Sequence, residues 1–305
     1  CCGNNMIKVA WAPIYHHHLP DNHRFPMSKY SLLPQQLLYE GTLTQENFFA
    51  PNLASETQIL RTHCPDYFQS LLDGSIDSKA QRKIGFPWSS QLIERERTIG
   101  QGTIDNTLFA IENGCSLNIA GGTHHAFYDR GEGFCMLNDI MLAAHHALDH
   151  SGISRILVVD LDVHQGNGTA AMAADDTRIF TFSMHGEKNY PYHKEHSDLD
   201  LPLPDYINDK TYLSLLNETL DALFEKVNPE LVFFQSGVDV LESDKLGRMG
   251  LTLNGCKDRD IAVISRCYQN AIPLVINMGG GYSPEIKTII EAHATTFRTC
   301  VHYYQ

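Results

Sequence analysis

The 305-residue sequence lacks the features of several common protein classes. No stretch approaches the roughly 18 consecutive apolar residues that a membrane-spanning helix needs, and no signal peptide is visible. The eight cysteines include no Cys-x-x-Cys pair, and several lie in apolar stretches where a reduced thiol behaves as a small hydrophobic residue. We therefore expect a cytoplasmic protein without a membrane span.

Basic residues are also scarce. Lys and Arg total 23 against 36 Asp and Glu, which leaves a formal charge of −13. This balance argues against direct nucleic-acid binding and against anionic membrane surfaces, whereas cationic substrates remain compatible with it. With 43% hydrophobic and 19% charged residues the chain can bury a core, so disorder is excluded.

Nothing in the sequence divides the chain in two, since it contains no internal repeat, low-complexity tract or linker rich in Ser, Gly and Pro. Cys1 to Asn5 precede a plausible initiator, Met6, and we interpret residues 1–5 as an expression remnant or disordered tail. Residues 6–305 are predicted to form a single domain.

Short apolar runs alternate with helical patterns along the chain. The runs do not alternate polar with apolar residues, which is typical of strands buried on both faces. The predicted strands are Ile7–Trp11, Ser116–Ala120, Arg155–Val163, Arg178–Phe182, Glu230–Phe234 and Pro273–Met278, and the predicted helices are Leu137–His150, Lys210–Val227, Asp258–Asn270 and Pro284–His293. This order predicts an α/β fold with an open, mainly parallel sheet covered by helices on both faces.

Two less regular stretches complete the prediction. The N-terminal third, from Tyr15 to Glu96, is expected to form helices and rim loops. The Pro-containing segment Leu201–Asp205 is expected to be a loop.

Polar or Gly-rich clusters follow four of the predicted strands. They are NIAGGTHHA (Asn118–Ala126), VVDLDVHQGNG (Val158–Gly168), FFQSGVD (Phe233–Asp239) and INMGGGY (Ile276–Tyr282). Because open α/β sheets bind ligands outside the carboxyl ends of their strands, the four clusters predict one active site at that edge.

Asp162, His164 and Asp239 are the predicted metal ligands. Asp162 and His164 lie two residues apart, so on an extended strand end their side chains point the same way. Two carboxylates and one imidazole suit a catalytic zinc site with open positions, and iron(II) accepts the same donors. An isolated Asp-x-His is also typical of a capped turn, but the other three clusters favour the metal site.

Adjacent histidines occur at three places, as two pairs and one run of three, and only one pair follows a predicted strand. His124 and His125 stand after two glycines at a strand end, where adjacent imidazoles beside a metal can transfer protons. We place His145 and His146 on a helix surface, and His16–His18 in a solvent-facing or rim loop.

Tyr282 ends a triple glycine. Glycines allow the backbone to approach a ligand closely, and the phenol can donate to a developing oxyanion. No Walker motif, G-x-G-x-x-G or G-x-S-x-G occurs, which disfavours nucleotide-binding and serine hydrolase functions.

Together these clusters resemble the zinc-dependent histone deacetylase family, which has the arginase–deacetylase fold. The resemblance runs from His23–Pro26 to the last predicted helix, through GGTHHA, DRGEGFCMLND (Asp129–Asp139), DLDVHQGNG, SGVDVLESDKLG (Ser236–Gly247) and GGGY. HQGNG and the D-x-L-G tail look most similar to class IV deacetylases and their bacterial relatives.

The resemblance implies a role for each matching residue. Asp162, His164 and Asp239 would bind zinc, His124 and His125 would be the acid/base pair, and Tyr282 would hydrogen-bond the acyl carbonyl. Asp160 and Asn167 would support the two histidines. A structural K⁺ or Na⁺ would bind Asp160, Asp162, His164, Ser183 and Met184, and the substrate channel would include Gly133, Phe134, Tyr190, Leu246 and Gly280.

The sequence departs from the family pattern at three positions. Asn167 stands where class I members have aspartate, so a neutral group faces His125 and either histidine remains open as the general base. Lys245 replaces a proline usual in classes I and II. Leu246 occupies the position, seven residues after Asp239, where polyamine-specific relatives carry a gatekeeper glutamate.

The predicted function is hydrolysis of acyl-lysine in a protein or peptide. The first alternative is deacetylation of small acylated amines such as polyamines, which the acidic charge favours and Leu246 disfavours. Binuclear manganese chemistry of the arginase type would need further aspartates near the metal. An inactive acyl-lysine-binding module is the remaining alternative, against which the retained ligands, histidines and tyrosine argue. The class IV resemblance also makes long fatty-acyl groups candidate substrates.

Overall fold

The chain folds around one parallel sheet of eight strands. The computed structural model describes residues 6–305, so the interpretation of residues 1–5 concerns a part outside the described residues. The strand order is β2-β1-β3-β8-β7-β4-β5-β6, and every neighbouring pair is parallel. The strands are β1 (Lys8–Ala10), β2 (Phe48–Phe49), β3 (Cys115–Asn118), β4 (Ile156–Asp160), β5 (Ile179–Gly186), β6 (Leu199–Leu203), β7 (Leu231–Gln235) and β8 (Leu274–Asn277).

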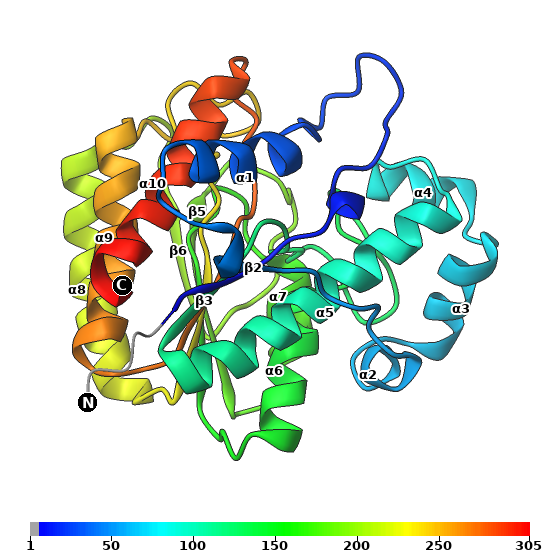
Figure 1. Cartoon of the computed structure of the whole chain (residues 1–305), viewed down its shortest axis with the longest axis horizontal. Coiled ribbons are helices and arrows are strands. Elements are labelled where there is room, and N and C mark those ends of the chain that lie inside the picture. The colour runs from blue at the N-terminus through cyan, green and yellow to red at the C-terminus, as the bar shows by residue number, and fades with distance from the viewer. Residues whose placement is uncertain (1–5) are drawn as a thin grey trace.

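Helices cover both faces of the sheet (Figure 1). One layer contains α8, α9 and α10, with α1 packed on α10, and the other contains α5, α6 and α7. The short helices α2, α3 and α4 form a lobe beside α5 and α6. The helices are α1 (Lys29–Tyr39), α2 (Glu56–Leu60), α3 (Pro65–Asp73), α4 (Ser78–Ile84), α5 (Ser90–Asn113), α6 (Asp139–His150), α7 (Asn167–Ala173), α8 (Asp209–Val227), α9 (Leu253–Gln269) and α10 (Ile286–Tyr304), with 3₁₀ turns at Pro13–Tyr15 and Gln45–Asn47.

The central strands are buried along their whole length, as their apolar sequences predict. Every residue of β3, β4, β7 and β8 is buried. Strands enclosed by helices on both faces need apolar side chains in both directions, which is why they show no alternation. The predicted fold class is confirmed.

The four strands that carry the polar clusters are consecutive in the sheet, in the order β3-β8-β7-β4. Since all four are parallel, their carboxyl ends lie at one edge, next to one another. The sequence predicts this convergence, and the strand order produces it.

The loop predicted at Leu201–Asp205 is wrong for its first three residues, whereas Pro204 and Asp205 lie outside any strand as expected. Residues 199–203 form β6, which pairs in parallel with β5 from Phe182–Leu199 to Gly186–Leu203. Proline lacks the amide hydrogen that a central strand needs, but an edge strand has one side without partners. Because β6 is an edge strand, Pro202 is tolerated there.

Two histidine placements are also wrong. His145 is buried, and its Nδ1 lies 2.9 Å from Thr62 Oγ1, because α2 covers that face of α6. His17 is buried between His16 and His18, which are exposed as expected.

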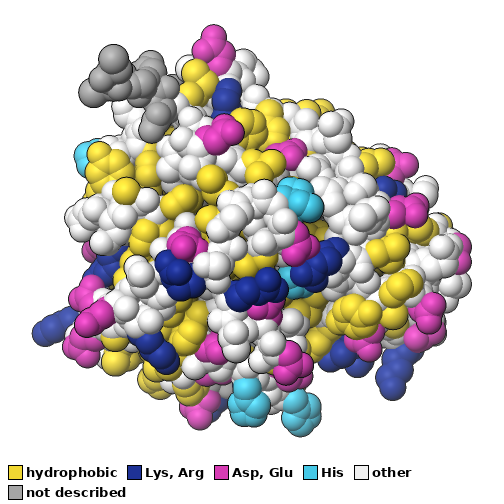
Figure 2. Space-filling model, turned by 90° about the horizontal axis from the view of Figure 1, so that it is seen from below, with side chains coloured by type: hydrophobic (Ala, Val, Ile, Leu, Met, Phe, Trp, Pro, Cys, Tyr) yellow, Lys and Arg dark blue, Asp and Glu magenta, His cyan; other side chains and the backbone are white. Residues whose placement is uncertain are grey.

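The end of the molecule at the amino ends of the strands, opposite the predicted active site, carries side chains of both charges. Figure 2 views it from below, toward the amino ends of the strands, and Lys and Arg side chains are interspersed there with Asp and Glu. Just before β4 and β5, Arg155 pairs with Glu230 at 2.9 Å and Arg178 with Asp176 at 2.6 Å. Within residues 6–305 the six cysteines are free thiols, and none of the helices combines the length and the apolar composition of a membrane span.

Candidate metal centre and active site

The three predicted metal ligands converge at adjacent strand ends. Asp162 and His164 follow β4, and Asp239 follows the neighbouring β7. One ligand atom from each lies within 4.8 Å of the others. His164 Nδ1 is 3.0 Å from Asp162 Oδ1 and 3.1 Å from Asp239 Oδ2, and all three residues are buried.

The surroundings of the two carboxylates suit a cation. A Cβ atom at Gly237 would collide with the Asp162 carboxylate, and one at Gly280 would collide with that of Asp239, so glycines make room for both. Burial, and then the charge of Asp162, raise the pKa of Asp239 to about 7. Buried carboxylates that crowd one another are stabilised by a shared cation, and the donor set of two oxygens and one nitrogen fits zinc.

The paired histidines lie beside this triad and have unequal partners. His124 Nδ1 donates to Asp160 Oδ2 at 2.6 Å, and His125 Nδ1 donates to Asn167 Oδ1 at 2.7 Å. Although burial opposes it, the charges of Asp160 and Asp162 raise the pKa of His124 to about 9. Burial and the neighbouring His124 hold the pKa of His125 well below its usual value. The structure therefore favours a protonated His124 and a neutral His125.

A carboxylate to which the sequence analysis assigned no role holds the loop in front of the histidines. Asp139, at the start of α6, accepts hydrogen bonds from the backbone of Gly122 and Thr123 at 3.1 and 2.8 Å. It also accepts from the Thr103 hydroxyl at 2.6 Å. Its position at the end of the DRGEGFCMLND motif could have marked it as a functional residue, but only the fold shows which groups it contacts.

Gly133 and Phe134 form one side of the predicted channel. Both have left-handed backbone conformations, with φ of 56° and 67°. A Cβ at Gly133 would lie 2.7 Å from His125 Cδ2, so only glycine fits. The backbone of Phe134 donates to Ile84 O at 2.7 Å, which ties this wall to the end of α4.

Of the other residues predicted for the channel, some line the cavity and some do not. The Tyr190 ring packs perpendicular to His125 with centroids 5.0 Å apart, and its hydroxyl donates to Glu132. Gly280 lines the cavity. Leu246 is not among the cavity-lining residues, and its carbonyl accepts from Asn189 Nδ2 at 2.7 Å.

Residues predicted for a monovalent cation meet across two strands. Asp160 of β4 is the register partner of Ser183 of β5, and Met184 follows it in the buried interior. Asp160 also accepts a hydrogen bond from the Asp162 backbone at 3.2 Å, which links this group to the metal ligands.

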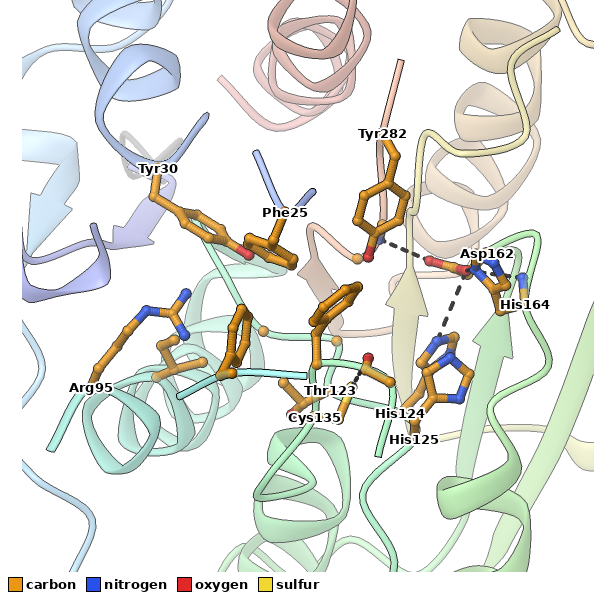
Figure 3. A pocket seen from close by; sticks show the side chains of 18 residues that line it. Phe25, Tyr30, Arg95, Thr123, His124, His125, Cys135, Asp162, His164 and Tyr282 are labelled. Carbon is orange, nitrogen blue, oxygen red and sulfur yellow. Dashed lines mark hydrogen bonds and ion pairs between the residues drawn. The ribbon is translucent and has the colours of Figure 1, made fainter. Parts of the chain in front are cut away.

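Tyr282 faces the cavity from its other side (Figure 3). The centroid of its ring lies 6.5 Å from the ring centroid of His164 and 6.0 Å from that of Phe25. In Figure 3 its hydroxyl points into the space between the histidines and the aromatic side chains. We call Asp162, His164, Asp239, His124 and His125 together the polar wall of the cavity; Tyr282 is not part of it.

The opposite side, which we call the aromatic wall, consists of Phe25, Tyr30, Phe86 and Phe134. The ring centroid of Phe25 lies 5.0 Å from that of Phe86 and 5.1 Å from that of Phe134, and Phe86 lies 5.2 Å from Phe134. Three mutually packed rings form a continuous apolar surface.

A comparison with protein-family models decides the assignment. The histone deacetylase domain matches residues 23–297, nearly the whole chain. The chain belongs to the histone deacetylase family. The match begins at His23, where the sequence resemblance begins, and the family relationship predicted from the motifs is confirmed.

Curated relatives agree with this membership. A protein from Picosynechococcus sp. that carries no assigned function is 41% identical over 298 residues, which covers 98% of this chain and 99% of that protein. Histone deacetylase 2 of Arabidopsis thaliana is 30% identical over 285 residues, covering 88% and 72%. Acetoin utilization protein AcuC of Staphylococcus aureus is 27% identical over 289 residues, covering 86% and 73%.

Solved structures of the deacetylase family share the fold. A crystal structure of an HDAC homolog complexed with SAHA superposes with a TM-score of 0.83 at 24% identity, covering 97% of this chain and 84% of that one. An HDAC homolog from Aquifex aeolicus gives a TM-score of 0.80, covering 96% and 83%. The predicted arginase–deacetylase fold is confirmed.

The deacetylase cavity also contains a cation that the sequence analysis did not identify. Arg95 of α5 lines its far end, where Nε donates to Tyr15 O at 2.7 Å and the guanidinium pairs with Glu96. The guanidinium carbon lies 5.0 Å above the centre of the Tyr30 ring. The segment ERER in a helix is typical of a solvated face, so no sequence signal distinguished this arginine.

Proposed function

We propose that this histone deacetylase family member is a zinc-dependent hydrolase of acyl-lysine in proteins or peptides. The observation that carries the proposal is the buried triad beside two histidines with unequal partners. Perturbed ionisable groups that converge in a buried cavity are typical of catalytic sites. The motifs that resemble class IV deacetylases and their bacterial relatives support the same activity.

Asp162, His164 and Asp239 would hold the zinc ion. When bound, zinc would polarise the acyl carbonyl as a Lewis acid. Iron(II) is the alternative metal, because mixed nitrogen and oxygen donors suit both ions. A potassium or sodium ion near Asp160 and Ser183 would support the strand ends from behind.

The two histidines would divide the proton transfers. His125, with Nδ1–H donating to Asn167, keeps Nε2 free to accept a proton from the attacking water. His124, charged beside Asp160, would stabilise negative charge and supply a proton to the leaving amine. Tyr282 would donate a hydrogen bond to the acyl oxygen as charge develops there.

Small acylated amines are the second candidate substrates. The acidic net charge of −13 and the similarity to a protein named for acetoin utilization favour them. Leu246 argues against polyamines among them, because it stands where polyamine-specific relatives carry a gatekeeper glutamate. Among residues 6–305, Asp162, His164 and Asp239 are the only group of at least three His, Cys, Asp or Glu side chains that converges on a possible metal site, which argues against arginase-type binuclear chemistry.

The test is hydrolysis by zinc-loaded and iron(II)-loaded protein of one lysine peptide carrying acetyl, octanoyl or myristoyl, with acetylspermidine alongside. Peptide turnover is expected, and the preferred chain length would report the depth of the cavity. Turnover of acetylspermidine alone would move the assignment to small amines. Metal-loaded protein that binds acyl peptides without hydrolysing them would support the inactive binding module instead.

A further inference from the structure

The loop that carries Tyr282 has little conformational preference of its own. Three glycines precede the tyrosine, and two of them, Gly279 and Gly281, have φ of 66° and 156°. Glycine adopts many backbone conformations at similar free energy, so such a loop needs outside contacts to hold one geometry. The contact to the Tyr282 backbone comes from a carboxylate five residues after Asp239.

That carboxylate belongs to Asp244, which accepts three backbone hydrogen bonds. Oδ1 accepts from Leu246 and Gly247, both at 2.8 Å, and Oδ2 accepts from Tyr282 at 2.6 Å. The first two bonds close an Asx-type turn, and the third leaves the turn to reach the tyrosine loop. The neighbouring Ser243 and Ser283 hydroxyls lie 2.8 Å apart, so two successive residues of one loop contact two successive residues of the other.

The same turn lies against the backbone of a proposed metal ligand. A Cβ at Gly247 would collide with the carbonyl oxygen of Asp239, so the turn is in close contact with that residue. In addition, Val238 N–H donates to Gly280 O at 2.8 Å. The loop after β7 therefore contacts the tyrosine loop on both sides of Asp239.

We propose that Asp244 is a positioning residue that fixes the Tyr282 backbone to the loop carrying Asp239. It thereby holds the tyrosine hydroxyl at a constant place relative to the metal ligands. This inference rests on the proposed function, since it acts through the role given there to Tyr282. Because a hydrogen-bond donor must be aligned with the developing charge, a small displacement of Tyr282 lowers turnover without removing the metal.

The sharpest variant is Asp244→Asn. The side-chain oxygen of the introduced amide can still accept from the backbone N–H groups of Leu246 and Gly247. Its NH2 group then faces the Tyr282 N–H, and two donors cannot form a hydrogen bond. The turn is kept and the bond to the tyrosine is lost. Glu242→Gln removes a charge from an exposed side chain two residues away and is the matched control.

Two measurements test the proposal. In the first, kcat of Asp244→Asn falls by about 10-fold or more, up to the loss of about 10²–10³ typical of an absent oxyanion donor, while zinc content stays that of the parent. The Asp244→Asn substitution has little further effect in Tyr282→Phe protein, because both substitutions remove the same contribution. Equal losses in both backgrounds, or lost zinc, would overturn the proposal.

The second measurement does not need turnover. 3-Fluorotyrosine at position 282 is expected to give one sharp ¹⁹F resonance in the parent and in Glu242→Gln, and a broadened or split resonance in Asp244→Asn. An unchanged resonance would refute the positioning role. If the parent hydrolyses none of the test substrates, the proposed function fails, and the ¹⁹F signal still reports whether Asp244 positions Tyr282.

Discussion

The polar wall and the aromatic wall of the cavity differ in how the fold builds them. The polar wall follows β3, β4 and β7, so strand register and parallel pairing set its geometry directly. The aromatic wall comes from residues before and within α1, after α4 and before α6, which meet through ring packing and loop hydrogen bonds and not through strand pairing. The proposed catalytic groups are thus attached to the ends of paired central strands, whereas the surface that would contact substrate is attached to loops, which vary more easily.

The largest expected effect is on the polar wall. Asp162→Ala or Asp239→Ala should abolish zinc binding and lower turnover by more than about 10³-fold, beyond the loss of a single oxyanion donor. Metal analysis and turnover of the same samples check this. Asp221→Ala, which removes an exposed carboxylate on α8, is the control; zinc retained in Asp162→Ala would contradict the proposed ligand set.

Tyr282→Phe should lower kcat by about 10²–10³-fold with zinc retained, because it removes the proposed hydrogen-bond donor to the acyl oxygen. Steady-state kinetics and metal content measure the two effects separately. Tyr192→Phe removes an exposed hydroxyl and should behave as the parent. Hydrolysis by Tyr282→Phe at the parent rate would show that the phenol does not contact the reacting group.

The aromatic wall should affect binding more than chemistry. Phe134→Ala is expected to raise KM by about 10-fold or more, the size of effect typical of lost hydrophobic contact with substrate, while kcat changes little. Phe109→Ala, on α5 and outside the cavity lining, is the control. A fall in kcat with unchanged KM would mean that the two walls do not divide their functions in this way.

The smallest effect distinguishes the two histidines. Asn167→Asp puts a negative charge beside His125 Nδ1 and should raise the pKa of His125, typically by about 1–3. In the proposed mechanism activity requires neutral His125, so the acid limb of kcat/KM is expected to move to higher pH: turnover falls near pH 6 and is unchanged near pH 8. The pH profile of kcat/KM measures this, and an acid limb that does not move would exclude His125 as the general base.

Much of the fold could be predicted because it depends on local patterns. The apolar runs located six of the eight strands, since strands buried on both faces leave a clear signal. β2 has only two residues, and β6 contains a proline that normally indicates a loop. Helix ends were less well predicted, since α9 begins at Leu253 and α10 continues to Tyr304.

The sequence by itself determined which residues could form the polar wall. Asp162, His164, Asp239, His124 and His125 lie within a few residues of strand ends, so a parallel sheet that places these strands close together brings them together. Only the tertiary structure decided what surrounds them. Phe25, Arg95 and Asp244 reach the cavity or its loops through contacts between segments far apart in the chain, and no local pattern encodes such contacts. The same reason explains why His145 is buried, because a second helix covers a face that α6 alone would expose.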